Sequence, residues 1–144
     1  MMAKKYIFLF FIAAVAIAAV VVYFIWNKPH KNIKDAVAIE ISSGQLYDSF
    51  TNDSAGTKSK YINKVLSVSG KVTAISKNQQ NQQIILLKTN TADASINCTM
   101  EEKANNIREG DIVSVKGICS GYIPGDKDMD LPGDVFLIRC YCLI

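Results

Sequence analysis

The sequence predicts a mainly β fold with short helices: a five-stranded barrel that follows a helical segment and an N-terminal transmembrane helix. Three observations support this prediction. Residues 1–26 contain a long apolar run, residues 43–62 have the apolar spacing of helices, and residues 64–144 contain five short segments with the alternation and turn boundaries of strands. We therefore expect an anchor over 1–26, a juxtamembrane linker over 27–38 and one folded domain over 39–144.

The apolar run extends from Tyr6 to Trp26 and contains no charged residue. At about 1.5 Å per residue a helix of this length spans about 30 Å, the thickness of the hydrocarbon core of a bilayer. We expect residues 6–26 to hold the chain in a membrane as a single-pass anchor. The alternative is a cleaved signal peptide, because small alanines follow a basic start, but the run is longer than the about 7–15 residues usual for such peptides.

Charge is distributed unevenly along the chain. Five lysines flank the apolar run, so the rest of the chain holds 11 of the 16 basic residues and all 13 acidic ones. A slightly acidic domain does not favour a polyanionic partner such as nucleic acid. The lysines on the two sides of the run do not decide its orientation.

The expected linker contains the only histidine, His30. A solvated residue beside the headgroups explains it more simply than a pH sensor or a ligand does. With no other imidazole in the chain, no Ser-His-Asp triad can be built. We expect no enzymatic activity, no cofactor and no metal.

The helical lead-in covers residues 43–62. Ser42 and Gln45, three residues apart, fit a capping box at the start of a first helix. A second helical segment is expected to begin near Asp53 and to run towards Tyr61. The apolar face of the first helix would consist of Leu46, Tyr47 and Phe50.

Five strands are expected over the barrel region, 64–144. The first begins at Lys64, and Gly70 in its middle suggests a bulge or a sharp bend. The others are expected over 84–88, 94–100, 112–120 and 135–143, with a brief helix over 101–106. Five strands with a helix between the third and the fourth follow the order of an OB-fold, a small Greek-key barrel.

Glycines, cysteines and apolar residues of these strands also share a characteristic spacing. They are Val68, Ser69, Gly70, Lys71 and Val72 in the first strand, Gly110, Asp111, Val113, Val115, Gly117, Cys119, Gly121 and Tyr122 around the fourth, and Asp134, Val135, Leu137 and Cys140 in the fifth. With this pattern, residues 40–144 resemble the tRNA_anti-like OB-fold family, small anchored or exported proteins of Bacteroidetes-type bacteria. The resemblance implies a fold and a location in the envelope, with residues 6–26 anchored in a bacterial inner membrane. It supplies no ligand or catalytic residue. Cys142 and a long loop over 122–133 depart from the family pattern.

The four cysteines, Cys98, Cys119, Cys140 and Cys142, all lie in the expected domain. Strand alternation directs all of them towards the barrel interior, the last two on the side of Phe136 and Ile138. In an OB-fold the fifth strand lies between the third and the fourth, so the fifth-strand cysteines would face Cys98 and Cys119.

We expect a disulfide between Cys119 and Cys140, with Cys98 either pairing with Cys142 or remaining a thiol. Such a bridge would stabilise a small periplasmic domain. Two alternatives remain open. The cysteines are buried free thiols that pack as small apolar residues, or they bind zinc, for which paired cysteine spacing and a usable histidine are missing.

The long loop carries a possible interaction site: Tyr122, Asp126, Asp128 and Asp130. Carboxylates at alternate positions can wrap a calcium ion. An EF-hand would need glycine at Leu131 and glutamate at Leu137, so a solvated acidic loop is the better interpretation.

With 144 residues the chain is too short for a large multidomain enzyme. We expect a non-enzymatic OB-fold binding module, anchored in the membrane with its C-terminal domain in the periplasm, whose partner is an envelope protein, a peptide or a glycan. The alternative is a nucleic-acid-binding OB domain that faces the cytoplasm. The second and third strands contain no aromatic residue for stacking bases, which weighs against that alternative.

Overall fold

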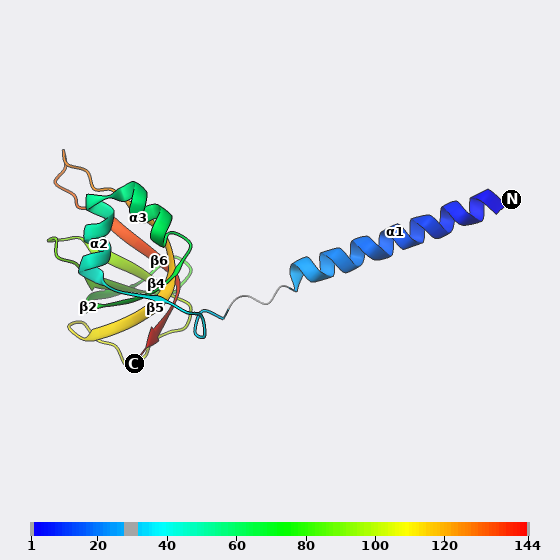
Figure 1. The fold of residues 1–144 in the computed structure, drawn as a ribbon. Coiled ribbons are helices and arrows are strands. Elements are labelled where there is room, and N and C mark those ends of the chain that lie inside the picture. Colours follow the sequence, from blue (N-terminus) through cyan, green and yellow to red (C-terminus); the bar gives the residue numbers. More distant parts are fainter. Residues whose placement is uncertain (1, 28–31, 144) are drawn as a thin grey trace. The chain divides into compact units, whose positions relative to one another are not determined.

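A computed structural model describes residues 2–27 and 32–143 of the chain. His30 of the expected linker lies outside these residues. The chain divides into two compact units, Met1–Asn32 and Ile33–Ile144. The first contains helix α1 and the second contains the barrel (Figure 1).

Helix α1 covers Met2–Trp26. The span Ala3–Trp26 has a mean hydropathy of 2.9, and none of its most apolar stretch is buried within the structure. By length and composition α1 can cross a membrane, and a signal sequence near the N-terminus meets the same criteria.

The second unit is a closed five-stranded barrel, as the sequence predicts. Its strands are β2 (Val65–Lys77), β3 (Gln83–Lys88), β4 (Ser95–Met100), β5 (Ile112–Ile123) and β6 (Asp134–Leu143). They follow the order β2-β3-β4-β6-β5, and β5 pairs back with β2 to close the barrel. Only the β4–β6 pair is parallel among these barrel neighbours. The expected position of β6 between β4 and β5 is confirmed.

Strand β2 is long enough to pair with two different strands of the barrel. Its residues 65–71 pair with β5, and the half from Val72 onward pairs with β3. The register shift lies between Val72 and Ala74 rather than at Gly70. Gly70 has a packing role instead, because an added Cβ would collide with the side chain of Ser43.

A short strand that the sequence analysis did not predict, β1 (Ile39–Ser42), runs parallel to β2. Helix α2 (Ser43–Asn52) follows immediately, and the Ser42 hydroxyl caps it by accepting the N–H of Gln45 at 3.3 Å. Helix α3 (Ser54–Tyr61) is capped by Asp53, whose carboxylate accepts the N–H of Gly56 at 3.1 Å. The predicted helical lead-in therefore forms as two capped helices.

Helix α2 closes one end of the barrel. It buries Leu46, Tyr47 and Phe50, as expected for its apolar face, and the Ser43 hydroxyl donates to the carbonyl of Lys88 at the end of β3. Burial of these side chains joins them to the barrel core. The core residues of the strands are Leu66, Val68, Val72, Ile85, Leu87, Ile96, Cys98, Met100, Val115, Cys119, Val135, Leu137 and Cys140.

The brief helix expected over 101–106 is absent, and the segment forms bends and turns. Its backbone groups bond to the barrel instead of to one another. The N–H of Glu101 donates to the carbonyl of Cys140 at 2.9 Å, and the side chain of Gln83 accepts from and donates to the backbone of Ala104 at 2.8 and 3.2 Å. These bonds use the groups that a helical turn would need.

Strand β6 contains one extra residue near Arg139. Cys98 of β4 pairs with Leu137, and Met100, two residues further along β4, pairs with Cys140, three residues further along β6. Arg139 has a φ of 53°, in the left-handed region. This bulge shifts the alternation of β6 by one residue. The buried side of β6 consists of Val135, Leu137 and Cys140.

Candidate binding site at the β5–β6 loop

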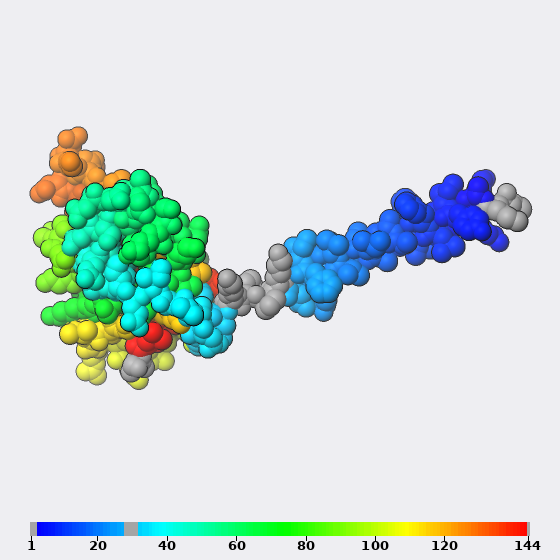
Figure 2. Space-filling model, viewed as in Figure 1, coloured from blue at the N-terminus to red at the C-terminus, as the bar shows by residue number. Residues whose placement is uncertain are grey.

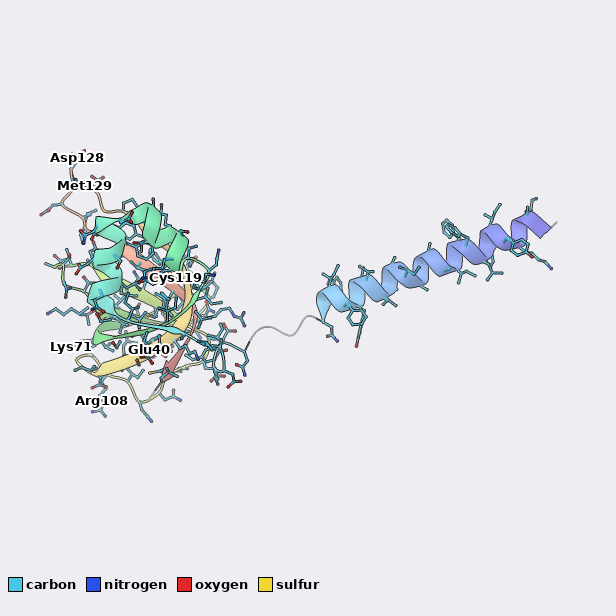
Figure 3. The ribbon with its side chains drawn as sticks, viewed as in Figure 1. Glu40, Lys71, Arg108, Cys119, Asp128 and Met129 are labelled. Carbon is cyan, nitrogen blue, oxygen red and sulfur yellow. The ribbon has the colours of Figure 1, made fainter. Side chains whose placement is uncertain are left out.

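The loop over residues 124–133 joins β5 to β6 at the end of the barrel that α2 closes. It stands out from the surface beside α2 and α3 (Figure 2), and Asp128 and Met129 lie at its tip (Figure 3). Ile123, Met129 and Leu131 are 61%, 65% and 55% exposed. The sequence-predicted loop site is thus on the surface, with apolar side chains that bury little in the domain.

Hydrogen bonds within the loop shape its tip. The Asp126 carboxylate accepts the N–H groups of Asp128 and Met129 at 2.9 and 3.4 Å, and the Asp126 carbonyl accepts the N–H of Leu131 at 2.9 Å. Asp130, with a φ of 52°, turns the chain back towards Leu131. The tip is therefore a small hairpin held by hydrogen bonds within the loop.

Two glycines form the neck of this hairpin. A Cβ added at Gly125 would lie 2.6 Å from the backbone nitrogen of Gly133, and one added at Gly133 would lie 2.8 Å from the ring of Tyr122. Real Cβ atoms do not approach other atoms so closely. Only glycine allows the two arms of the loop to pass this near to each other and to Tyr122.

Aromatic rings join the loop to α2. The ring of Tyr122, at the end of β5, stacks on Phe50 with centroids 5.4 Å apart and meets Tyr47 edge to face at 6.1 Å. Burial raises the pKa of Tyr47, and the nearby Tyr122 raises it further. Both effects favour the neutral phenol of Tyr47, so its ring contributes stacking surface without negative charge at neutral pH.

One side of the loop forms a cavity of about 430 Å³, here named the lysine hollow. Lys58 of α3 and Lys127 of the loop are the charged residues in its lining, and no carboxylate of the described chain is among them. Its full lining is Tyr47, Phe50, Thr51, Ser54, Lys58, Tyr122, Pro124, Gly125, Lys127, Leu131, Pro132 and Gly133.

The other side of the loop forms a cavity of about 380 Å³, here named the acidic hollow. Three carboxylates line it, from Asp93 in the β3–β4 loop and from Asp126 and Asp130 in the β5–β6 loop, together with Lys127. The two hollows share a wall of four residues, which are Tyr47, Lys127, Leu131 and Pro132.

A larger depression, of about 650 Å³, lies between β1, α2 and α3. Its carboxylates include Asp48, which accepts a 2.8 Å hydrogen bond from Asn90, and Asp53, which caps α3. Because these two carboxylates already form hydrogen bonds that stabilise the fold, we place the candidate site at the loop.

The structure does not gather the aspartates of the loop around a common point. The Asp134 carboxylate turns to Ser95, accepting its N–H at 3.0 Å and its hydroxyl at 3.2 Å, while Asp126 holds the tip. Over the residues described, no group of three or more histidines, cysteines or carboxylates is placed to hold a metal ion. Asp128 lies at the tip (Figure 3) and does not line either hollow.

The cysteines do not form the expected disulfide. Cys98, Cys119, Cys140 and Cys142 are free thiols, and no pair lies at bonding distance, so both expected pairings, Cys119–Cys140 and Cys98–Cys142, are absent. The expected alternation of β6 is also wrong. Ile138 is 41% exposed and Phe136 is half-buried, because the bulge at Arg139 separates them from the face of Cys140.

Three of the thiols, Cys98, Cys119 and Cys140, are fully buried. Burial raises the pKa of Cys119 to about 11. The pKa of Cys140 is raised first by its hydrogen bond with Cys98 and then by burial. Thiols of this kind are unreactive and pack as small apolar side chains, so the cysteines belong to the core rather than to the candidate site.

Tyr122, Asp126 and Asp130 are predicted from the sequence as site residues, whereas Tyr47, Lys58 and other lining residues of the hollows are not. Tyr47 was expected only as part of the apolar face of a helix. Its position beside Tyr122 depends on how α2 closes the barrel, for which local spacing contains no signal.

Fold and site define a small OB-fold domain with an exposed loop site, preceded by an apolar helix. The tRNA_anti-like family model matches residues 1–131. The chain therefore belongs to the tRNA_anti-like family, and the resemblance seen in the sequence is confirmed. No curated protein matches the sequence significantly.

Two of the solved structures that resemble the chain illustrate this similarity. One is a Klebsiella pneumoniae protein provisionally named a nucleic acid-binding lipoprotein, with a TM-score of 0.49 and 15% identity, covering 81% of this chain and 100% of its own. The other, from Leishmania major, is provisionally named an aspartyl-tRNA synthetase, with a TM-score of 0.42 and 9% identity, and the match covers 86% of this chain and 25% of that protein. We infer nothing about function from either.

Proposed function

We propose that this protein is a membrane-anchored binding module whose loop end holds an envelope protein, peptide or glycan. One observation carries the proposal: the β5–β6 loop is ordered by glycine packing and its own hydrogen bonds, yet exposes Met129 and Leu131. Order without burial contributes little to folding. It does lower the entropy cost of binding, because less of the loop has to be ordered when a partner binds.

We further propose that α1 is the anchor and that the domain lies in the periplasm. The length and mean hydropathy of α1 support anchoring, and the family resemblance supports an envelope location. Free thiols at Cys98 and Cys140 do not contradict this placement, because they lie in the core where an oxidant has little access. The domain is proposed to bind rather than to catalyse, since the site offers exposed lysines and aspartates but no activated nucleophile.

The side of the membrane can be tested at the loop tip. The variant Met129→Cys places a thiol where the native side chain is 65% exposed, against native thiols that are mostly buried. A membrane-impermeant maleimide applied to intact spheroplasts should label this variant and leave the parent chain almost unlabelled. Labelling only after lysis would place the domain in the cytoplasm. A soluble form of the chain whose mass shows a shortened N-terminus would show that α1 is cleaved.

The binding site can be tested by comparing the two ends of β5. A photo-crosslinking residue at Met129 should give specific adducts in cells, whereas one at Ile112, which is 82% exposed at the opposite end of the strand, should not. Competition with excess purified domain should remove the adducts at position 129. Equal adducts at both positions would contradict a binding site at the loop.

The second candidate is a nucleic-acid-binding domain that faces the cytoplasm. Aromatic rings beside Lys58 and Lys127 in the lysine hollow favour it, because stacking with nearby cations suits single strands. Strands β3 and β4, described over their whole length, contain no aromatic residue, which weighs against a base-stacking face there. Salt-dependent anisotropy of a labelled single-stranded RNA would decide, with tight binding at about 150 mM salt supporting this candidate.

A further inference from the structure

The two hollows beside the loop differ in charge although they share a wall. Lys58 lines only the lysine hollow, and Asp93 lines only the acidic hollow. Leu131 and Pro132 separate them, and Leu131 is 55% exposed. A ligand that covers this wall therefore meets positive charge on one side, an apolar ridge in the middle and negative charge on the other.

The cavity volumes limit what can enter. The hollows measure about 430 and 380 Å³, and small-molecule pockets lie in the range of about 300–1,000 Å³. Each can therefore hold one or two side chains rather than a folded domain. An extended segment that crosses the wall at Leu131 fits this geometry.

We infer that the site takes a short peptide segment in which an acidic and a basic residue flank an apolar one. This inference rests on the proposed function and names the ligand of the same site. The acidic residue lies in the lysine hollow near Lys58 and Lys127, and the basic residue lies in the acidic hollow near Asp93 and Asp130. The apolar residue covers Leu131.

The charge pattern argues against two other classes of partner. A polyanion that entered the lysine hollow would meet Asp126 and Asp130 as it crossed the loop, and like charges repel. An anionic bilayer would meet Asp128 beside Met129 at the loop tip (Figure 3), so the tip is not suited to insertion among acidic lipids. A segment of mixed charge satisfies both hollows at once.

The test uses the full chain in nanodiscs of zwitterionic lipid as bait for a random nine-residue peptide display library. Selected peptides should be enriched in an acidic and a basic residue around an apolar one. The tightest synthetic peptide, measured by anisotropy, should lose affinity about tenfold or more when either of its charged residues is changed to glutamine.

Charge-reversal variants test each hollow separately. Lys58→Glu should weaken binding of the selected peptide. Affinity for this variant should recover when the acidic residue of the peptide is changed to lysine. Asp93→Lys should also weaken binding, and affinity should recover when the basic residue of the peptide is changed to an acidic one. The matched controls are Lys60→Glu, on the same helix but outside the lysine hollow, and Glu109→Lys, in the β4–β5 loop, which should leave affinity within about twofold.

The outcomes separate this inference from the proposed function. Peptides that bind at the loop, as Met129 crosslinking would show, but carry no paired charges would overturn the inference and leave the loop site standing. Peptides that bind elsewhere would overturn both. Selection of no peptide, while crosslinking still yields an adduct of a folded protein or a glycan at position 129, would also overturn the inference.

Discussion

The ammonium group of Lys116 in β5 donates a 2.8 Å hydrogen bond to the backbone carbonyl of Lys34, which lies 82 residues away in sequence. Lys34 in turn forms a 2.8 Å ion pair with Glu102 and lies 4.8 Å above the ring of Tyr141. Beside it, Ile33 is only 1% exposed. The start of the second unit is therefore packed on the barrel, within the span 27–38 that the sequence suggests as a linker.

We predict that Lys116→Met will detach this segment. Methionine keeps most of the apolar stem but removes the donor, and a hydrogen bond from a charged group contributes about 1.5–3 kcal/mol. Urea unfolding should show a loss of about 1–2 kcal/mol, and limited proteolysis should cut faster near residues 33–38. The control is Lys71→Met, at an exposed position of β2. Unchanged stability and proteolysis in Lys116→Met would contradict the role of this bond.

We predict that stability falls as the pH rises from about 9 to 11, because burial raises the pKa of the Cys119 thiol from 9.0 to about 11. In this range the unfolded chain releases the thiol proton while the native chain keeps it. The contribution is fully present below pH 9 and is lost above it.

Thermal melts between pH 7 and 10.5 check this prediction. Cys119→Ala should give a shallower decline than the parent chain. Val115→Ala, a buried apolar position on the same strand, should lower stability without changing the slope. The shifts of Tyr47 and Cys140 have the same direction, so some decline should remain. Parallel profiles for the parent and Cys119→Ala would disprove the assignment.

We predict that Gly117→Ala is destabilising by about 1–3 kcal/mol, as expected for overpacking. An added Cβ would collide with the sulfur of Cys140 and lie 3.1 Å from the carbonyl of Ile138. Cys140→Ala removes the sulfur, so the double variant should be more stable than the sum of the single effects allows. Chemical denaturation of all four proteins measures this coupling. Strict additivity would show that the sulfur is not what excludes a side chain at position 117.

We predict that Arg139→Gly is neutral or stabilising by up to about 1 kcal/mol. The left-handed backbone, with a φ of 53°, costs an L-residue roughly 1–2 kcal/mol and glycine almost nothing, although glycine has more entropy to lose on folding. The ion pair with Glu101, at 3.8 Å and partly exposed, contributes little. Asn97→Gly, at an ordinary position of β4, should instead be destabilising. Similar losses in the two variants, measured by urea unfolding, would refute the argument.

Local pattern predicted the elements well where the interactions that form them are local. The five strands lie within a few residues of their expected spans, and the cap at Ser42 forms as its spacing indicates. The helix over 101–106 was wrong because Gln83 and Cys140 take its backbone hydrogen bonds from across the barrel. Strand β1 was missed because four residues carry too little periodicity to be distinguished.

The disulfide prediction failed for a related reason. It assumed that Cys119 and Cys140 face each other. Both are buried, but Cys119 of β5 pairs with Leu137, and Cys140 lies further along β6, beyond the extra residue at Arg139. The residue type at position 139 does not indicate the bulge, because glycine is the usual signal and this residue is arginine.

The sequence by itself determined the apolar N-terminal helix, the five strands, the family and the exposed acidic loop, because periodicity, length and composition act through neighbours along the chain. Only the tertiary structure decided that Phe50 stacks on Tyr122, that Lys58 and Asp93 line opposite sides of one loop, and that the thiols remain unpaired. Those relationships depend on how α2 closes the barrel and where β6 bulges, and both are set by packing between segments far apart in the chain.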